Sequence, residues 1–490
     1  MIIVGLGKAN HDCNISLAVD GVITKYAKYE RDVNVKSMPA YEYWFYKKLH
    51  QWNIDTDKVD LWVHTDSGSY RDDYNVPFLP HEDCIYWKKQ RNNKEILLDH
   101  HTAHVWSNLS YNNDKQYVIV DGEGSNNNKV LIFNGKQIIR RKSISPGGLY
   151  IWLTNAMNIH KGKFGNSAGK VMGIASYGKR IEDLFQKLVS NNPDDYLFLT
   201  EEYIKNFFKN KKVDSQECMD FIKTIDDVCF EMIKGYFQSL NKQDEIIYSG
   251  GCALNVEWNR KLKDMGYKLN IEPPTYDGGL SLGCVRFGHH YLNLPVPNQI
   301  KNYPYIQDDE KPDSVPSLET IEEVADLLAN GKIVGWYQGN GELGPRALGN
   351  RSILMNPKIK NCKDILNKKV KHREWWRPYG ASVLEEKSNL YFSDTNSPYM
   401  LFNMNVLTND LPGITHIDNT CRPQTVNENQ NKYFYLLLKA FERKTGLPIL
   451  LNTSLNLGGD PIVSNVELAK NVLNKTELDA LCVGDLIYKK

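Results

Sequence analysis

The sequence predicts an α/β protein with two lobes. Apolar runs of strand length repeatedly lead into Gly/Asp turns and then into segments with helical apolar spacing, which is the pattern of α/β domains. At 490 residues the chain is too long for one ordinary core, so we expect about two to four domains. The composition also changes near residue 296, where proline and polar residues become frequent.

The N-terminal part is expected to alternate short strands, tight turns and helices. Asp20-Gly21 between two apolar runs is typical of a hairpin. The order suggests two related halves, although the sequence shows no convincing repeat. The expected strands are Ile2–Gly5, Ile15–Val19, Val22–Tyr29, Leu61–His64, Glu95–Leu98, Tyr117–Val120, Val130–Phe133 and Glu245–Tyr248, and the expected helices are Leu149–His160, Asp220–Leu240 and Ala253–Leu262.

Residues 296–317 are rich in proline and polar side chains, which favours an interdomain linker. The expected domains are therefore 1–295 and 318–490. In the second domain, helical spacing and glycine caps predict helices Leu318–Asn330, Tyr433–Thr445 and Val463–Leu473, and apolar runs predict strands Ile333–Tyr337, Pro448–Leu451 and Ala480–Val483.

Composition limits the classes of function. With 60 basic and 59 acidic residues, the chain is not expected to coat nucleic acid over a broad face, although it can read a short piece. No apolar run approaches the ~20 residues of a membrane span, and the N-terminus lacks the basic region of a signal peptide. Nine cysteines without a CxxC pair indicate free thiols, so we expect a cytoplasmic protein. Nothing indicates its oligomeric state.

The segment from Gly339 to Val383 concentrates cations in a loop broken by glycine and proline. A guanidinium donates two parallel hydrogen bonds to a planar oxyanion, and glycine lets backbone N–H groups approach it. The sequence therefore predicts an anion pocket; the alternative is a solvated basic surface. The candidates are Arg346, Arg351, Lys371, Arg373 and Arg377, with Arg422 from a later segment.

His100 and His104 are four residues apart in DHHTAH, where a helix through Ser107 would place both imidazoles on one face. That spacing suits one metal ion, with Asp121 or Asp277 as further ligands, and imidazoles with carboxylates suit iron, manganese or zinc. Two polar helix residues without a ligand are the alternative. His11, in a turn beside Asp12, is a candidate general base or a residue that holds the turn.

Glycine-rich turns end several apolar strands, and backbone N–H groups at such turns cradle phosphates. Their number in one lobe favours nucleotide binding. The candidates are Asp12, Gly122, Lys170, Gly250, Gly251 and Asn255. In the second lobe Asn452, Ser454 and Asn456 are interpreted as adenylate contacts, the alternative being a helix N-cap.

Taken together, these motifs resemble the O-carbamoyltransferases of antibiotic and nodulation-factor biosynthesis. The resemblance covers almost the whole chain and rests on their order and spacing. The motifs are the His11-Asp12 turn, DHHTAH, VDGEG, GKVMGIASYG, SGGCALN, PPTYDGG, GELGPRALGNRSIL, VKHREWWRP, HIDNTCRPQTV and LPILLNTSLNLGGDPIV.

The resemblance implies an actin-like, sugar-kinase-like N-terminal lobe and a C-terminal lobe similar to threonylcarbamoyl-adenylate synthase. Carbamoyl phosphate and ATP, with Mg²⁺, would give carbamoyl-adenylate and pyrophosphate in the second lobe. An acceptor hydroxyl, deprotonated by His11, would then take the carbamoyl group in the first. The resemblance assigns the anion and adenylate contacts to the candidates above, with Arg346, Lys371 and Arg373 catalytic. It assigns a metal, iron in the first instance, to His100, His104, Asp121 and Asp277.

The chain departs from the family where an acceptor would bind: KYERDVNVKSMP keeps Glu30-Arg31 but little else of the usual stretch, and Asn419 replaces a usual glycine. The acceptor stays open between a sugar or natural product and a 5-hydroxymethylpyrimidine, free or in DNA. Aromatic and basic residues interleave over Tyr86–Arg91, which favours a strand-binding surface or an ordinary basic turn. The alternatives to O-carbamoyl transfer are a tRNA threonylcarbamoyl transferase and a non-catalytic actin-like scaffold.

Overall fold

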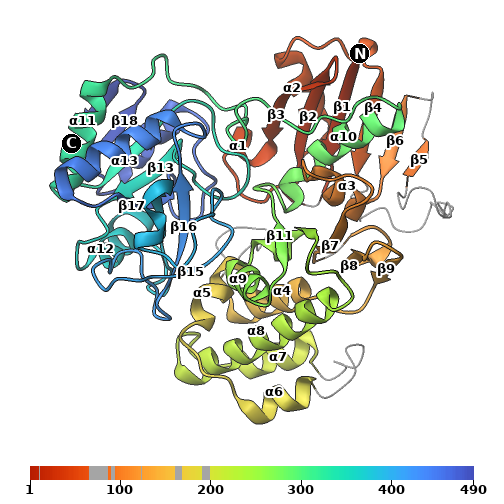
Figure 1. Ribbon diagram of the computed structural model, residues 1–490, viewed down its shortest axis with the longest axis horizontal. Coiled ribbons are helices and arrows are strands. Elements are labelled where there is room, and N and C mark those ends of the chain that lie inside the picture. The colour runs from red at the N-terminus through yellow and green to blue at the C-terminus, as the bar shows by residue number, and fades with distance from the viewer. Residues whose placement is uncertain (10, 66–86, 90–93, 123, 160–167, 190–198) are drawn as a thin grey trace. The chain divides into compact units, whose positions relative to one another are not determined.

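The computed structural model divides the chain into two compact units (Figure 1). Unit 1 comprises Met1–Glu30 with Ser37–Ile300, and unit 2 comprises Arg31–Lys36 with Lys301–Lys490. The predicted linker, residues 296–317, falls on both sides of this division, and Gln307 and Asp309 within it are buried. The structure describes residues 1–9, 11–65, 87–89, 94–122, 124–159, 168–189 and 199–490.

Unit 1 contains one strand topology twice. In each sheet a central strand is flanked on one side by an antiparallel meander and on the other by two parallel strands. The predicted pair of related halves is confirmed at the level of strand order. The first sheet has the strand order β3-β2-β1-β4-β6-β5, and its strands are β1 (Ile2–Gly7), β2 (Asn14–Val19), β3 (Val22–Lys28), β4 (Leu61–Thr65), β5 (Trp87–Lys89) and β6 (Glu95–Leu98). The second sheet has the order β11-β10-β7-β8-β9, and its strands are β7 (Gln116–Val120), β8 (Val130–Phe133), β9 (Ile138–Arg141), β10 (Glu245–Ser249) and β11 (Lys268–Asn270).

The helices of unit 1 mostly begin at side-chain caps, which satisfy the first free backbone N–H groups of each helix. Asp99, for example, accepts a hydrogen bond from Thr102 N at 2.8 Å and starts the helix that carries His100 and His104. The helices are α2 (Glu42–Gln51), α3 (His100–Ser107), α4 (Pro146–Met157), α5 (Ala168–Ala175), α6 (Glu182–Val189), α7 (Glu201–Phe208), α8 (Gln216–Phe237), α9 (Val256–Asp264) and α10 (Leu280–Tyr291), and α1 (Tyr29–Val33) begins in unit 1 and ends in unit 2.

Helix α10 packs closely against both α3 and β1 because glycines lie at the two crossings. A Cβ atom on Gly283 would stand 2.0 Å from the carbonyl oxygen of Ala103, and one on Gly5 would stand 2.2 Å from that of Ser281. Real Cβ atoms do not approach so closely, so only glycine permits these contacts.

A buried arginine fixes the end of α3. Arg286, on α10, is 1% exposed and donates hydrogen bonds to the carbonyls of Trp106 and Leu109 at the C-terminus of α3, at 2.5 and 3.1 Å, and to Pro297 O at 2.7 Å. A cation there satisfies carbonyls that lack helical partners and complements the negative end of the helix dipole. Arg286 therefore holds α3 on α10.

Unit 2 is built on one mixed eight-stranded sheet, which confirms the predicted α/β class. Its order is β15-β16-β14-β17-β13-β12-β18-β19. The strands are β12 (Val334–Tyr337), β13 (Arg351–Met355), β14 (Gly380–Leu384), β15 (Met404–Asn405), β16 (Thr420–Val426), β17 (Ile449–Ser454), β18 (Ala480–Val483) and β19 (Leu486–Lys489), and the helices are α11 (Leu318–Ala329), α12 (Cys362–Ile365), α13 (Lys432–Thr445) and α14 (Val466–Lys475).

Two local predictions for unit 2 are wrong. Arg351 does not lie in the glycine-broken loop but opens β13, opposite Tyr337. The predicted strand at Pro448–Leu451 continues through Ser454, because Asn452 and its neighbours pair with β13 and β14.

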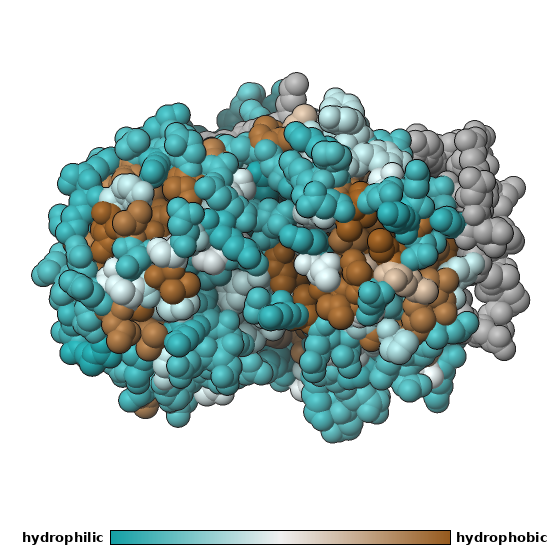
Figure 2. Space-filling view, turned by 90° about the horizontal axis from the view of Figure 1, so that it is seen from above, coloured by the Kyte–Doolittle hydropathy of each residue, from teal (hydrophilic) through white to brown (hydrophobic). Residues whose placement is uncertain are grey.

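The face in Figure 2 is mostly hydrophilic, with apolar side chains gathered in separate patches. Large exposed apolar residues such as Val22, Leu318 and Leu486 occur in both units. Among the described residues, no helix combines the length and the apolar character that crossing a bilayer requires.

We expect Arg286→Met to lower the free energy of unfolding by about 3 kcal/mol or more, because several buried carbonyls would lose their donor. Lys205→Met is the matched control, since Lys205 is 56% exposed and its pairing with Glu201 is worth at most about 1 kcal/mol. Urea denaturation measures both, and equal losses would contradict the role given to Arg286.

Candidate functional site

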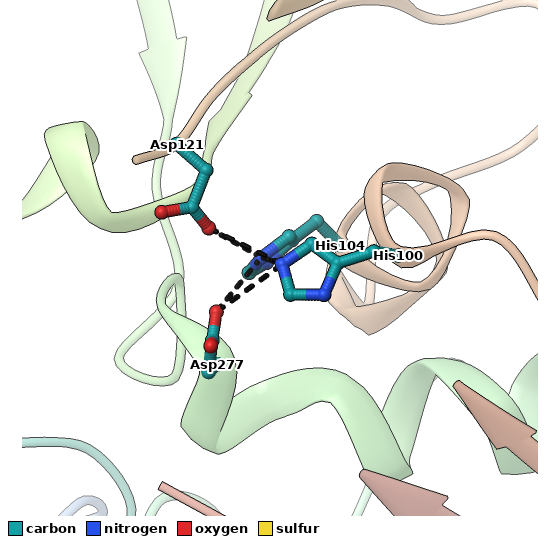
Figure 3. Close-up of side chains that lie close together, drawn as sticks. All are labelled: His100, His104, Asp121 and Asp277. Carbon is teal, nitrogen blue, oxygen red and sulfur yellow. Dashed lines mark hydrogen bonds and ion pairs between the residues drawn. The ribbon is translucent and has the colours of Figure 1, made fainter. Parts of the chain in front are cut away.

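Two imidazoles and two carboxylates converge in unit 1, as Figure 3 shows. We call His100, His104, Asp121 and Asp277 the His/Asp cluster. His104 Nε2 lies 3.0 Å from Asp121 Oδ2 and 3.4 Å from Asp277 Oδ1, and His100 Nε2 lies 3.4 and 3.3 Å from the same two atoms. The four candidate ligand atoms all lie within 4.8 Å of one another.

The fold explains why these four meet. His100 and His104 occupy one face of α3, Asp121 directly follows the central strand β7, and Asp277 begins the short 3-10 turn that leads into α10. Because α10 is held tightly against α3, the carboxylate at its start lies beside the imidazoles.

The cluster has the charge balance of a divalent cation site. Burial disfavours every charged form, yet Asp277 and Asp121 raise the pKa of His100 well above its ordinary value, and the imidazoles lower the pKa of Asp121 to about 2. The carboxylates thus favour positive charge between them, which protons on the imidazoles or one divalent ion can supply. The donor set of two nitrogens and two oxygens fits iron, manganese or zinc.

His11 lies next to the cluster. Its Nδ1 is 2.8 Å from Asp12 Oδ2 and 3.7 Å from Asp277 Oδ2, and its side chain is 47% exposed. Burial lowers the pKa of His11, but the hydrogen bond to Asp12 and the charges of Asp277, Asp12 and Asp121 outweigh it and raise the pKa to about 9. A cation bound to Asp121 and Asp277 would offset part of that effect.

Asp12 does not have the environment of a nucleotide contact. Its carboxylate is 3% exposed and is occupied by His11 and by the ammonium of Lys28. Asn255 is also engaged elsewhere: its oxygen caps α9 by accepting from Glu257 N at 3.1 Å and Trp258 N at 3.2 Å, and its amide donates to Tyr150 Oη at 3.1 Å. Both residues are better explained by these structural roles.

The glycine candidates lie around Asp121. Gly122 N donates to Asp121 Oδ1 at 2.7 Å, and a Cβ on Gly251 would stand 3.2 Å from the same oxygen. Gly250 has φ +89° and donates its N–H to Thr275 O, so it makes the turn and has no free amide. Lys170 lies apart, donating to Ile159 O at 2.5 Å.

Unit 2 contains a group of cations, the cationic cluster of Lys371, Arg373, Arg377 and Arg422, in which Lys371 is buried and the three arginines are half-buried. Lys371 is 3% exposed, and its ammonium donates to the carbonyls of Ser454 and Asn456 at 2.9 and 3.2 Å. Burial, with the charges of Arg373, Arg377 and Lys36, lowers the pKa of Lys371 well below its ordinary value.

The guanidinium groups of the cluster also lack full compensation. Burial and the neighbouring guanidinium groups lower the pKa of Arg377 to about 10, against partial compensation by Glu374. Burial lowers that of Arg422 to about 10, and its buried Nε has no hydrogen-bond partner among the described residues. Arg373 donates to Asn367 Oδ1 at 2.8 Å and stacks 4.2 Å from the ring of Tyr379. An excess of buried positive charge is the condition that a bound anion relieves.

Arg351 is held mainly by the backbone. It is fully buried and donates to the carbonyls of Gln338, Asn350, Glu310 and Gly339 at 2.5 to 3.0 Å, with its guanidinium stacked 3.6 Å from the ring of Tyr337. Its buried Nε has no hydrogen-bond partner among the described residues, and its role as an anion contact stays a prediction. Arg346 lies in the preceding loop and is half-buried.

Two of the three adenylate candidates, Ser454 and Asn456, contact Lys371. Asn452 is 1% exposed and donates to Ser382 Oγ at 2.9 Å, while its buried Oδ1 has no partner within the described chain. Ser454 Oγ donates to Asn456 Oδ1 at 2.7 Å, and both residues are half-buried. The helix N-cap alternative does not apply, since Asn452 and Ser454 lie within β17.

Sequence reasoning missed residues that surround the two clusters. Lys28, Tyr276 and Asn14 pack beside His11 and Asp277, and Lys36 lies near Lys371. The one available signal for Lys28 was strand alternation, which places it on the same face of β3 as the buried Tyr26. The basic-aromatic segment Tyr86–Arg91 lies outside the described residues, except for the backbone of β5.

Comparison with known proteins gives two family matches. The profile described as "Carbamoyltransferase N-terminus" matches residues 21–285, and "Carbamoyltransferase C-terminus" matches residues 325–490. Among solved structures, the activator of 2-hydroxyisocaproyl-CoA dehydratase from Clostridium difficile is 10% identical with a TM-score of 0.38, over 60% of this chain and 96% of that one.

Curated relatives cover most of the chain. Nodulation protein NolNO of Sinorhizobium fredii is 31% identical over 80% of this chain, which spans 64% of that protein's length. The 3'-hydroxymethylcephem-O-carbamoyltransferase of Amycolatopsis lactamdurans is 28% identical over 76% of this chain and 74% of that protein. The two family profiles together match both units, and the chain belongs to the carbamoyltransferase family.

Proposed function

We propose that this protein is an ATP-dependent O-carbamoyltransferase that works in two steps, one in each unit. The proposal is carried by one observation: this chain of the carbamoyltransferase family contains both an undercompensated cationic cluster and a His/Asp cluster with His11 beside it. The first suits a polyanionic donor, and the second suits activation of a hydroxyl.

In the first step unit 2 joins the carbamoyl group to AMP. Water hydrolyses carbamoyl phosphate to carbamate and phosphate. A carbamate oxygen then attacks the α-phosphorus of ATP and expels pyrophosphate. Lys371, Arg373, Arg377, Arg422 and Arg346 neutralise the negative charge that both substrates bring. Asn452, Ser454 and Asn456 offer hydrogen bonds to the adenylate, and Mg²⁺ accompanies ATP.

In the second step unit 1 transfers the carbamoyl group to an acceptor. The acceptor hydroxyl attacks the carbamoyl carbon, its proton passes to the ring of His11, and AMP leaves. The Asp12 carboxylate at 2.8 Å holds Nδ1 of His11, so the other ring nitrogen is left for the substrate proton. A divalent cation at the His/Asp cluster would supply Lewis-acid polarisation of an oxygen atom.

The acceptor is a hydroxyl compound: a sugar or natural product, or a 5-hydroxymethylpyrimidine. Two relatives are named for a hydroxymethylated cephem and three for nodulation. The deciding experiment incubates the protein with carbamoyl phosphate, ATP and four acceptors, with mass detection of one added carbamoyl group. The acceptors are an N-acetylglucosamine oligomer, a 3'-hydroxymethylcephem, 5-hydroxymethyldeoxycytidine, and an oligonucleotide carrying that base. ATP binding without carbamoyl-phosphate-dependent pyrophosphate release would favour a non-catalytic scaffold.

The two steps are separable by mutation. We expect Arg346→Ala to abolish carbamoyl-phosphate-dependent pyrophosphate release, because the donor loses a cation. His11→Ala should keep that release within about twofold and lower carbamoyl transfer by about 10²–10⁴-fold, the usual contribution of a general base. Equal loss of pyrophosphate release in both variants would contradict the division between the units.

The stability contributed by Lys371 is expected to depend on pH. Its pKa in the folded state lies below the ordinary 10.5, so unfolding takes up a proton at pH values between the two. Wild type should therefore gain stability relative to Lys371→Met as pH rises through that window, and carbamoyl phosphate should raise the melting temperature of wild type more than that of the variant. Thermal melts of both proteins measure this, and a stability difference that is constant with pH would contradict it.

The His/Asp cluster is expected to hold about one equivalent of divalent metal. His104→Gln and Asp121→Asn should each lose it, as measured by elemental analysis of the purified protein, because each removes one of four ligands. His64→Gln is the matched control: this histidine is also buried in unit 1, but its Nε2 pairs with Glu95 at 3.1 Å. Chelation followed by return of Mg²⁺ alone should reduce transfer and spare pyrophosphate release; retention of metal by both ligand variants would overturn the assignment.

A further inference from the structure

Lys28 occupies an unusual position for a lysine. It ends β3, is 5% exposed, and extends its ammonium into the interior of unit 1. Buried lysines are rare unless they are paired. The ammonium contacts the carboxylate of Asp12, Glu30 Oε1 at 2.8 Å and Tyr276 Oη at 2.9 Å.

The contact with Asp12 reaches His11 directly. One oxygen of the Asp12 carboxylate pairs with Lys28, and the other lies 2.8 Å from His11 Nδ1. Each oxygen thus has its own partner, which leaves the carboxylate one orientation. Asp12 also has φ 59°, a left-handed conformation that residues other than glycine rarely adopt, so the side-chain contacts help to hold an otherwise unfavourable turn.

The same lysine reaches the loop that carries Asp277. Tyr276, which accepts from Lys28, directly precedes that aspartate. Asn14 makes a second connection between the two loops, because its amide donates to Asp12 O and to Asp277 O, both at 2.7 Å. Lys28 and Asn14, both on the β2–β3 hairpin, therefore fix the separation of His11 from Asp277.

We propose that Lys28 is the positioning residue of the transfer step: it locks Asp12, which in turn orients His11 against the acceptor, and it ties this turn to the Asp277 loop. The inference rests on the proposed function, since it assumes that His11 accepts the substrate proton. Lys28 touches neither substrate nor metal ligand; it acts through Asp12.

The test is a double-mutant cycle between Lys28→Met and His11→Ala. Lys28→Met should lower carbamoyl transfer by about 10- to 100-fold, as loss of a residue that orients a catalytic group does, with KM for the acceptor changed little. It should leave carbamoyl-phosphate-dependent pyrophosphate release within about twofold. In the His11→Ala background, Lys28→Met should lower carbamoyl transfer no further, because a residue that acts through His11 then has no side chain to orient. Lys25→Met, on an exposed position of the same strand, is the control and should transfer normally.

Lys28→Met could fail to fold, because Asp12 and Glu30 would lose their buried lysine partner. Two further variants therefore test the same role. Tyr276→Phe removes one contact of Lys28, and Lys28→Met with Glu30→Gln removes a charge pair; both should show the same transfer-specific loss. A crystal structure of either needs no acceptor and should show His11 displaced from its 2.8 Å contact with Asp12. Additive losses in the two backgrounds, or an unmoved His11, would overturn the proposal. Absence of carbamoyl transfer and of pyrophosphate release in wild type would instead refute the proposed function, while the His11 position would still decide the role of Lys28.

Discussion

The structure of unit 1 depends on the compensation of buried charge at the His/Asp cluster. Two carboxylates cannot be buried side by side unless positive charge meets them, and here two imidazoles on one turn of α3 do so at 3.0 to 3.4 Å. The arrangement requires α3 to be held against α10, which the Arg286 bonds and the close approach of Gly283 achieve. The same compensation can come from a divalent cation, so the packing that folds the unit also brings together the four ligands of the candidate metal site.

In unit 2 the positive charge is compensated only in part. Lys371 is buried and the three arginines of the cationic cluster are half-buried, with few acidic neighbours, and burial lowers the pKa values of Arg377 and Arg422 to about 10. Arg351 is held mainly by the backbone: four backbone carbonyls and a stacked tyrosine surround it. The buried Nε of Arg351 lacks a hydrogen-bond partner among the described residues, as that of Arg422 does, so the two arginines differ in how many carbonyls the rest of the guanidinium engages.

Sequence reasoning succeeded where a short motif carries the geometry. Two histidines four residues apart on a capped helix must share a face, and the order of strands and turns was sufficient to suggest two related halves. It failed where the deciding contact is distant in sequence. Asn255 follows a glycine turn as a phosphate-binding residue would, but a helix begins at the next position and takes its side chain as a cap. Arg351 joins a strand through pairing with Tyr337, and Lys28 meets Asp12 across a hairpin, neither of which leaves a periodic signal.

The two clusters explain why the proposed chemistry benefits from two separate sites. Carboxylates stabilise the protonated form of a nearby base, and His11 lies among three of them, which outweigh burial and raise its pKa to about 9. A cation bound to Asp121 and Asp277 would lower that pKa again, so that the neutral ring can accept the proton of a hydroxyl. A pocket for a polyanion needs cations, and burial together with neighbouring cations lowers the pKa of Lys371. One site cannot surround its groups with carboxylates and with cations at once, so the proposed mechanism binds the donor among the cations of unit 2 and deprotonates the acceptor beside the carboxylates of unit 1.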